Sequence, residues 1–307
     1  MKYLILGGNG FIGTEIAKKL DTNNQNDITI LDKRISNKKK YKFIYGDLTN
    51  INLCKVPNDF DVIINCASML GINNVMTHPY ETLLTNSACA ETGLKIAYNQ
   101  NNLYKYVYFS SSEVYGTQAL GKTEEDPFII GSSKETRWSY ATSKVFGEQL
   151  TFSAAKKLKI PVLVIRPFNI YGTTRGKAGA INALLHEAIE KHQVTITGNG
   201  EQERAWCHIS DFVNALLICI NNCNKNDIFN IGNSNEIYSI NQIVDLIENI
   251  IHIKLKRKYI SLAEDVITRS PDITKAQKMG YRPKVSLECG IKAILKDINY
   301  EIKSKKL

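Results

Sequence analysis

The sequence begins with a short apolar run, KYLIL, that leads directly into the glycine-rich stretch GGNGFIG. Gly7, Gly10 and Gly13 recur every three residues in it, and the helix-forming residues IAKKL follow. Glycines at this spacing allow a tight turn and let backbone N–H groups at a helix N-terminus approach a pyrophosphate. A strand, a glycine turn and a helix in this order therefore predict a dinucleotide-binding site, with Phe11 and Ile12 in the same turn.

An acidic residue stands where such a site requires one. Asp32 ends the apolar run DITIL and follows Gly13 by 19 positions. A carboxylate there accepts hydrogen bonds from the adenosine ribose and repels a 2′-phosphate, which favours NAD over NADP. Lys33 and Arg34 follow directly and weaken this preference. We therefore predict NAD as the cofactor.

Short apolar runs alternate with helical stretches over the first half of the chain. The strand-like runs are KYLIL, DITIL, YKFIY, DVIIN, KYVYFS and VLVIRP, and helices are expected from about Phe11, over Thr82–Tyr98 and over Tyr140–Lys157. Continuous apolar strands separated by helices are typical of a parallel sheet covered on both faces. The predicted fold class is α/β, a Rossmann-type, doubly wound parallel sheet of about seven strands.

The pattern loosens beyond Arg166 into TITG, RAWCHI, IFNIG and several helices, the last near Leu287–Lys303. We expect residues 1–168 to form the NAD-binding domain and residues 169–307 to form mainly a smaller, C-terminal substrate-binding lobe. The runs HISDFVNALL and IFNIG resemble returns to the first domain, so we expect residues near 209–232 to interleave the two parts.

Composition excludes several other classes of protein. The formal charge is +9 over 307 residues, but the basic residues fall into three short runs at 33–42, 254–258 and 303–307. Such runs are usually solvated, and no nucleic-acid-binding module accompanies them, so no nucleic-acid partner is expected. The apolar start is too short for a signal peptide or a membrane span. A cytoplasmic protein without a membrane partner is the expectation.

The seven cysteines include no CxxC pair, so we expect neither a disulfide framework nor a structural zinc site. Cys207 and His208 are adjacent but lack further ligands at metal spacing. No metal site is predicted.

Two hydroxyl-bearing stretches carry candidate chemistry. Tyr140 and Lys144 lie four apart in the helical stretch RWSYATSK, which puts both side chains on one face. A phenol is a poor base at neutral pH, but a neighbouring ammonium group stabilises the phenolate and lowers its pKa. Ser111, in the stretch SSEVYG, would hold a substrate oxygen against Tyr140.

Taken in order, GGNGFIG, Asp32, GDL (46–48), SSEVYG, YATSK and RPFNIYG (166–172) resemble the extended short-chain dehydrogenase/reductase family. Its members are NAD-dependent epimerases, dehydratases and decarboxylases of nucleotide sugars, and the resemblance covers nearly the whole chain. It implies that Tyr140 is the base, that Lys144 is its partner on the ribose and that Ser111 orients the substrate. The other cofactor contacts that it implies are Asp47 and Leu48 beside the adenine, and Ala67, Ser68 and Pro167.

The resemblance also implies a substrate site and an assembly. Asn169, Arg204 and Arg269 match residues that family members direct at the diphosphate of the sugar nucleotide, and guanidinium groups suit phosphate oxygens. Ser112 would lie beside the sugar. A homodimer that pairs through helices, including the one with Tyr140, is expected.

The reaction depends on Glu113. All these enzymes first oxidise the sugar at C4, and the 4-keto sugar then determines the product. The 4,6-dehydratases that this family resemblance brings in have Asp at the position of Ser112, so Ser112 argues against a 4,6-dehydratase. Ser-Ser-Glu resembles the Thr-Ser-Glu of the uronic-acid decarboxylases, so we predict decarboxylation of a UDP-uronic acid, such as UDP-glucuronate to a UDP-pentose. If Glu113 only closes a turn or binds a sugar hydroxyl, nucleotide-sugar 4-epimerisation becomes the better prediction.

Two features depart from a decarboxylase. The segment 67–86, expected as a loop over the substrate, does not match that branch closely, and it has no obvious basic residue to bind a carboxylate. His78 in this segment is given no role. Two other classes stay open: a non-catalytic NAD(P)-binding sensor, which would typically lack Tyr140 or Lys144, and a dehydrogenase that releases reduced cofactor.

Overall fold

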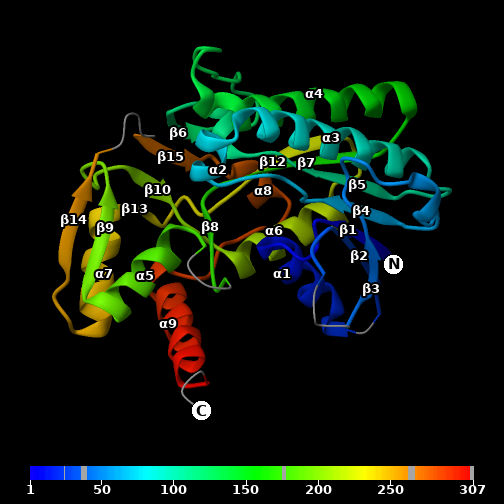
Figure 1. The fold of residues 1–307 in the computed structure, drawn as a ribbon. Coiled ribbons are helices and arrows are strands. Elements are labelled where there is room, and N and C mark those ends of the chain that lie inside the picture. The colour runs from blue at the N-terminus through cyan, green and yellow to red at the C-terminus, as the bar shows by residue number, and fades with distance from the viewer. Residues whose placement is uncertain (24, 36–39, 175–177, 262–266, 305–307) are drawn as a thin grey trace.

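A computed structural model describes residues 1–23, 25–35, 40–174, 178–261 and 267–304 (Figure 1). Within this part of the chain the largest sheet has seven strands, each parallel to its neighbours. Their spatial order is β12 (Asp227–Ile231), β7 (Val162–Pro167), β5 (Lys105–Phe109), β4 (Val62–Asn65), β1 (Lys2–Leu6), β2 (Asp27–Asp32) and β3 (Lys42–Tyr45). The predicted Rossmann-type α/β fold is confirmed.

The strand order reverses between β1 and β4. From β1 the chain steps outward through β2 to β3, and it then returns to the other side of β1 and continues through β4, β5 and β7 to β12. In open α/β sheets, ligands bind beyond the carboxyl ends of the strands at such a reversal. The fold therefore places a binding site beside the residues that follow β1 and β4.

Helices cover both faces of this sheet, α1 and α6 on one side and α3 and α4 on the other (Figure 1). The helices are α1 (Phe11–Leu20), α2 (Ile72–Thr77), α3 (Pro79–Tyr98), α4 (Ser139–Leu158), α5 (Ala180–Lys191), α6 (Ile209–Asn222), α7 (Ile240–Ile251), α8 (Thr274–Lys278) and α9 (Leu287–Ser304). Among the described helices, none is both long enough and apolar enough to cross a membrane.

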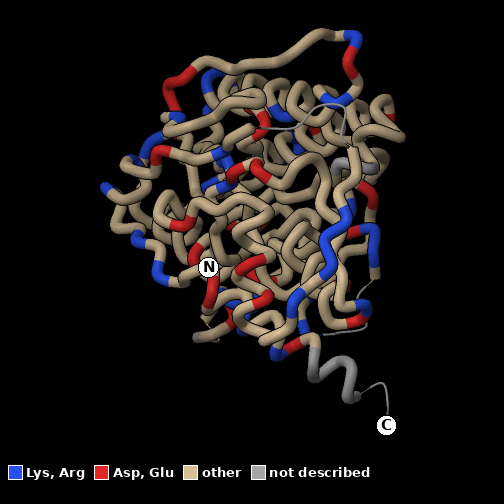
Figure 2. Tube along the Cα trace, turned by 90° about the vertical axis from the view of Figure 1, so that its left-hand side faces the viewer, with Lys and Arg blue, Asp and Glu red and all other residues tan. Residues whose placement is uncertain are grey.

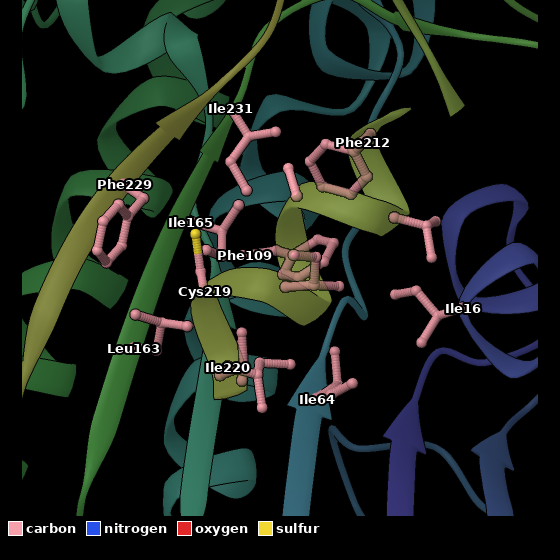
Figure 3. Packing of buried hydrophobic residues seen from close by; sticks show 14 of the residues in the cluster. Ile16, Ile64, Phe109, Leu163, Ile165, Phe212, Cys219, Ile220, Phe229 and Ile231 are labelled. Atoms are coloured by element: carbon pink, nitrogen blue, oxygen red, sulfur yellow. The ribbon is translucent and has the colours of Figure 1, made fainter. Parts of the chain in front are cut away.

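Two apolar cores follow from the two-residue repeat of the strands. Alternate residues of one strand point to opposite faces, so Ile5 packs beneath α1 and α6 whereas Leu6 packs beneath α3. Figure 3 shows the first of these cores, in which Phe109 of β5 meets Phe212 of α6 edge to face at 5.7 Å between ring centroids. Burial on both faces explains why the strands form continuous apolar runs.

Smaller sheets lie beside the carboxyl end of the large one. A four-stranded sheet has the order β13 (Ile237–Ser239), β10 (Glu203–Ala205), β15 (Thr268–Pro271) and β6 (Gln118–Lys122). Two strand pairs accompany it, β11 (Cys207–His208) with β8 (Ile170–Tyr171) and β14 (Lys256–Ile260) with β9 (Gln193–Thr197). A third core joins α5, α7 and α9. Strand β6 precedes residue 168 but belongs to the small sheet, where it pairs with β15. Strand β12 follows residue 168 but belongs to the large sheet, where it pairs with β7.

The expected loop at 67–86 is the clearest difference in secondary structure. It contains α2, and α3 begins at Pro79 rather than at Thr82. Proline suits the first position of a helix, where its missing N–H is not needed. The other helices for which bounds were predicted agree within a residue: α1 begins at Phe11, and α4 and α9 span Ser139–Leu158 and Leu287–Ser304.

Charged residues of both signs are interspersed along the chain (Figure 2). In the basic run 254–258, Arg257 and Lys254 form ion pairs with Glu248 of α7, and Arg257 also reaches Asp245. Parts of the other two basic runs, residues 36–39 and 305–307, lie outside the described residues.

Candidate active site

The cofactor end of the site, which comprises the turns after β1 and β4 and the first turn of α1, is formed mainly by backbone atoms. Gly7, which follows β1, has φ +76°, and a Cβ atom there would lie 2.8 Å from the Cα atom of Ala67, which follows β4. Gly13 is equally confined, because its Cβ would lie 2.7 Å from the Cα atom of Gly8. The glycines therefore let the turn, the first turn of α1 and the end of β4 approach one another. The result is a cradle with unpaired helix N–H groups facing outward.

The buried carboxylate of Asp32 holds this cradle. Its Oδ2 accepts a hydrogen bond from the Asn9 backbone N–H at 3.0 Å, and its Oδ1 accepts one from the Arg34 N–H at 2.8 Å. The Arg34 Nε lies 3.6 Å from the same carboxylate. Nearby, Lys33 pairs with Asp47 at 3.0 Å. Asp32 thus lies at the end of β2, where a ribose would be bound.

The other predicted cofactor contacts surround the same edge of the sheet. Phe11 and Ile12 open α1 and pack partly against the first core. Leu48 is buried, Ser68 follows Ala67, and Pro167 ends β7. Their contacts with a cofactor stay predictions.

The two predicted reactive stretches meet. Ser111 caps the short helix η3 (Ser112–Tyr115), and its Oγ accepts a hydrogen bond from the Glu113 N–H at 3.1 Å. The hydroxyl groups of Ser111 and Ser68 lie beside the Tyr140 hydroxyl, where both act to lower its pKa. One side chain from α4 therefore touches both the turn after β5 and the turn after β4, where the sugar and the cofactor would meet.

Lys144 is buried beneath Tyr140. Its side chain is 2% exposed, its Nζ donates to the Phe109 carbonyl at 2.8 Å, and it lies 5.5 Å from the Tyr140 ring centroid. Gly147 makes this approach possible, because a Cβ there would collide with the Tyr108 hydroxyl on β5. A small residue on α4 therefore brings the lysine against the end of β5.

Burial governs the titration of this pair. It raises the pKa of Tyr140 to about 12, and Glu113 adds to the rise, whereas the hydroxyl groups of Ser111 and Ser68 oppose it. Burial also lowers the pKa of Lys144 to about 8. The phenol is therefore protonated at neutral pH in the cofactor-free protein, and further positive charge is needed to turn it into a base.

Glu113 has a partner that is distant in sequence. Arg269 of β15, 5% exposed, donates from Nη1 to the Glu113 carboxylate at 2.5 Å. Burial acts to raise the pKa of Glu113, but the ion pair with Arg269, together with the charges of Arg137 and Arg204, outweighs burial and holds that pKa below its usual range. Glu113 is therefore anionic at neutral pH. The Arg269 Nε–H is buried and has no hydrogen-bond partner in the part of the chain that the structure describes.

The remaining substrate candidates lie beside this ion pair. Arg204 of β10 is the direct parallel neighbour of Arg269, so the two side chains share one face of the small sheet. Arg204 donates to the Glu203 carbonyl at 2.8 Å. Asn169, with φ +42°, donates to the Ala205 carbonyl at 3.3 Å. Ser112 is buried in η3. The fold gathers these residues, and their phosphate-binding roles stay predictions.

Two further residues at the site, Asn86 and Arg137, are not indicated by the sequence. Asn86 of α3 is fully buried, accepts the Met69 N–H at 2.7 Å and donates to Ser143 of α4 at 3.1 Å, so it holds the turn after β4 against α4. Arg137 precedes α4, stacks on Trp138 at 4.9 Å and lowers the pKa of Glu113. No periodicity or motif marks either residue. Within the described ranges, no three His, Cys, Asp or Glu side chains are grouped to hold a metal ion.

Comparisons with known proteins agree with this geometry. The chain is 30% identical to a UDP-N-acetyl-α-D-glucosaminuronate decarboxylase of Bacillus cytotoxicus, over 94% of this chain and 95% of that protein. It is 29% identical to a putative UDP-glucose 4-epimerase of Methanocaldococcus jannaschii, over 95% and 96%. A Bacillus cereus UDP-glucuronic acid 4-epimerase, solved with UDP-glucuronic acid and NAD, superposes with a TM-score of 0.86 at 25% identity, over 98% of this chain and 100% of that one.

The family model matches residues 3–232, which is about three quarters of the chain. This match confirms the resemblance found from the motifs, the prediction of an enzyme and NAD as the cofactor. The chain belongs to the NAD dependent epimerase/dehydratase family.

Proposed function

We propose that this protein decarboxylates a UDP-uronic acid through a 4-keto intermediate. The observation that carries the proposal is the ion pair of Glu113 and Arg269 beside Tyr140. Oxidation at C4 needs only Tyr140, Lys144 and Ser111, so a carboxylate–guanidinium pair at the same place favours a second chemical stage. Residues 67–86 contain no lysine or arginine for a sugar carboxylate, and we assign this role to Arg269 of β15.

The cofactor end fits a dinucleotide. A side chain at Gly7 or Gly13 would collide with neighbouring backbone in the cradle, and the N-terminus of α1 faces the cradle. The turn would hold the pyrophosphate, Asp32 the adenosine ribose and Lys144 the nicotinamide ribose. When bound, NAD+ accepts a hydride from the sugar and supplies positive charge near Tyr140.

In the first stage Tyr140 acts as the base. Its hydroxyl, aligned by Ser111, takes the proton of the sugar 4-OH as C4 is oxidised to a ketone. Lys144, which is mostly charged at pH 7 with a pKa of about 8, stabilises the phenolate. The buried setting excludes water from this transfer.

In the second stage the 4-ketone makes the sugar a β-keto acid. The bond from C5 to the carboxylate carbon breaks, its electron pair passes to the C4 carbonyl as an enolate, and carbon dioxide leaves. A proton must then be added at C5, and the hydride taken from C4 must return to C4 together with the proton held by Tyr140 to give the UDP-pentose. Because Glu113 is anionic, it would pass a proton from solvent to C5 rather than carry one in the resting enzyme. The Nε–H of Arg269, which has no partner among the described residues, would donate to a substrate oxygen.

Nucleotide-sugar 4-epimerisation is the second candidate. It would use the same Tyr140, Lys144 and Ser111, after which the 4-keto sugar turns over and receives hydride on its other face. The epimerase relatives favour it, in particular the Bacillus cereus enzyme solved with UDP-glucuronic acid. In that reaction Glu113 and Arg269 would only bind substrate.

We also propose a homodimer in the cytoplasm. Tyr80 and Leu84 of α3 and Phe146 of α4 are 69%, 55% and 47% exposed, and exposed apolar side chains on neighbouring helices are typical of a subunit interface. All seven cysteines are unpaired, which suits a reducing compartment.

A product analysis tests the reaction. Purified protein is incubated with NAD+ and either UDP-glucuronate or UDP-N-acetylglucosaminuronate, both 13C-labelled in the sugar, and products are followed by NMR together with released carbon dioxide. We expect carbon dioxide with a UDP-pentose or its 2-acetamido counterpart. A 4-epimer without carbon dioxide would make the protein an epimerase. Conversion only of UDP-sugars that lack a carboxylate would exclude a uronate substrate.

A further inference from the structure

A second buried ion pair lies behind the active site. Glu148 of α4 and Arg166 of β7 are 2% and 3% exposed. Arg166 Nη2 donates to Glu148 Oε2 at 2.7 Å, and its Nε donates to Glu148 Oε1 at 2.9 Å. This two-point geometry is the strongest that the two side chains can form. None of the chemical steps above uses either residue.

The pair holds the reactive turn at both ends. The Ser110 hydroxyl, directly before Ser111, donates to Glu148 Oε1. Arg166 Nη1 donates to the hydroxyl of Tyr115, the last residue of η3, at 2.5 Å. Ser111 and Glu113 lie between these two anchor points. One carboxylate–guanidinium pair thus restrains the whole turn.

The same network reaches the strands that interleave. The Tyr115 hydroxyl lies 2.8 Å from Asn230 Oδ1 on β12, and Asn230 donates to the Lys122 carbonyl at the end of β6 at 2.8 Å. Arg166 also donates to the Glu124 carbonyl at 3.2 Å. The ion pair that holds the turn is therefore connected to β7 and β12 of the large sheet and to the end of β6 in the four-stranded sheet.

The spacing on α4 connects this network with the chemistry. Tyr140, Lys144 and Glu148 recur every four residues, so they follow one stripe of a single rigid helix. Tyr140 meets Ser111 at one end of this stripe, and Glu148 holds Ser110 at the other. A fixed distance along the helix therefore sets where the turn lies relative to the base.

Energetics point in the same direction. Burying two charges costs so much desolvation that apolar replacements of such pairs are often as stable or more stable. Stability alone therefore does not account for an ion pair here, whereas catalysis needs its groups held within about 0.5 Å. We propose that Glu148 and Arg166 are positioning residues that fix Ser111 against Tyr140. The inference concerns C4 oxidation and holds for either fate of the 4-keto sugar.

The titration of Tyr140 tests this without any sugar. Protein labelled with 13Cζ-tyrosine is titrated as its NAD complex, and the Tyr140 resonance is assigned by its loss in Tyr140→Phe. The double variant Glu148→Met/Arg166→Met removes both charges, so the net charge near Tyr140 is unchanged. We expect its melting temperature to stay within a few degrees, while Tyr140 titrates at least one pH unit higher because Ser111 no longer holds it.

Two single variants keep the test sharp if the double variant does not fold. Ser110→Ala removes one anchor and leaves the ion pair intact, so we expect a smaller upward shift of the Tyr140 titration. Thr151→Val is the matched control, because among the described residues that buried hydroxyl on α4 bonds only to the Gly147 carbonyl. An unshifted Tyr140 in Ser110→Ala and in any folded double variant, or an equal shift in Thr151→Val, would overturn the proposal.

Discussion

The two ends of the active site are built in different ways. At the cofactor end the contacts lie within the first 67 residues and involve mainly backbone: Gly7 meets Ala67, and the Asn9 backbone N–H bonds to Asp32. At the reactive end Glu113 meets Arg269, 156 residues away, through side-chain charges. A site made of consecutive strands and turns can be recognised from a local motif, whereas a site closed by a late strand cannot.

The two ends also differ in their electrostatic demands. The cofactor end needs space and free N–H groups, which glycines provide at little cost. The reactive end buries Lys144 and Arg269, and it shifts the pKa values of Lys144 and Glu113. We therefore expect steric changes to damage the first end and changes of charge or hydroxyl groups to damage the second.

Tyr140→Phe gives the largest separation of the two ends. Removing the hydroxyl takes away the base, so we expect turnover to fall by about 10³-fold or more, in line with general-base catalysis. NAD binding, measured by calorimetry, should stay within a few-fold of the parent protein. Turnover that survives this change would show that another group abstracts the proton.

Gly13→Ala tests the cofactor end by steric means. The new Cβ would lie 2.7 Å from the Cα atom of Gly8, and overpacking of this kind costs about 1–3 kcal/mol. We expect NAD to bind roughly 10-fold to 100-fold more weakly, with no change in the position of Ser111 beside Tyr140. Affinity within a factor of three would mean that the turn is not closely packed around the cofactor.

Lys144→Met separates stability from activity. The pKa of Lys144 falls from 10.5 to about 8 in the folded protein, which corresponds to a destabilisation of about 3 kcal/mol at pH 7. The unfolded chain binds more protons than the folded one between pH 8 and 10.5, so this cost disappears as pH rises through that window.

The variant lacks this cost. Without cofactor it should unfold at a higher denaturant concentration than the parent protein at pH 7, by a margin that shrinks at pH 10, although it is inactive. A margin independent of pH would mean that burial does not lower the pKa of Lys144.

Tyr108→Phe has the smallest expected effect. The Tyr108 hydroxyl is buried near Lys144 without a hydrogen-bond partner among the described residues. Its removal should leave the free energy of unfolding unchanged or raise it by up to about 1 kcal/mol. The matched variant Tyr106→Phe removes a hydroxyl that accepts from Asn65 at 2.9 Å and should lower stability by roughly 1–2 kcal/mol. Equal effects would show that Tyr108 has a partner such as water.

The secondary-structure elements and the motifs that depend on local chemistry could be predicted from the sequence. Apolar runs predicted the strands of the large sheet, and the spacing of four brought Tyr140 and Lys144 together on α4. The sequence predicts that Ser111 lies near Tyr140, and in the structure Ser111 is close enough to lower the pKa of Tyr140. These inferences depend on periodicity and on neighbours in the chain, which a sequence displays directly.

The remaining features depend on how distant segments meet. The role of Arg269 at a phosphate stays a prediction, but its pairing with Glu113, which arises because β15 lies parallel to β6 and β10, is not indicated by the sequence. The pair of Glu148 and Arg166 is likewise formed by a helix and a strand whose packing no motif records. A charged residue in a sequence reveals its sign but not its partner, and the partner determines its pKa.

The central claim is that Glu113 serves the second chemical stage and not the first. Single-turnover mixing of Glu113→Gln, preloaded with NAD+, with the UDP-uronate that the parent protein converts tests it directly. The rise of absorbance at 340 nm reports C4 oxidation, trapped carbon dioxide reports decarboxylation, and the later fall of absorbance reports the return of hydride after C5 has been protonated. We expect reduced cofactor and carbon dioxide to form at nearly the parental rates, while the fall of absorbance and the formation of the UDP-pentose slow by about 100-fold. Equal slowing of the rise and the fall, or an unchanged fall, would contradict this role of Glu113.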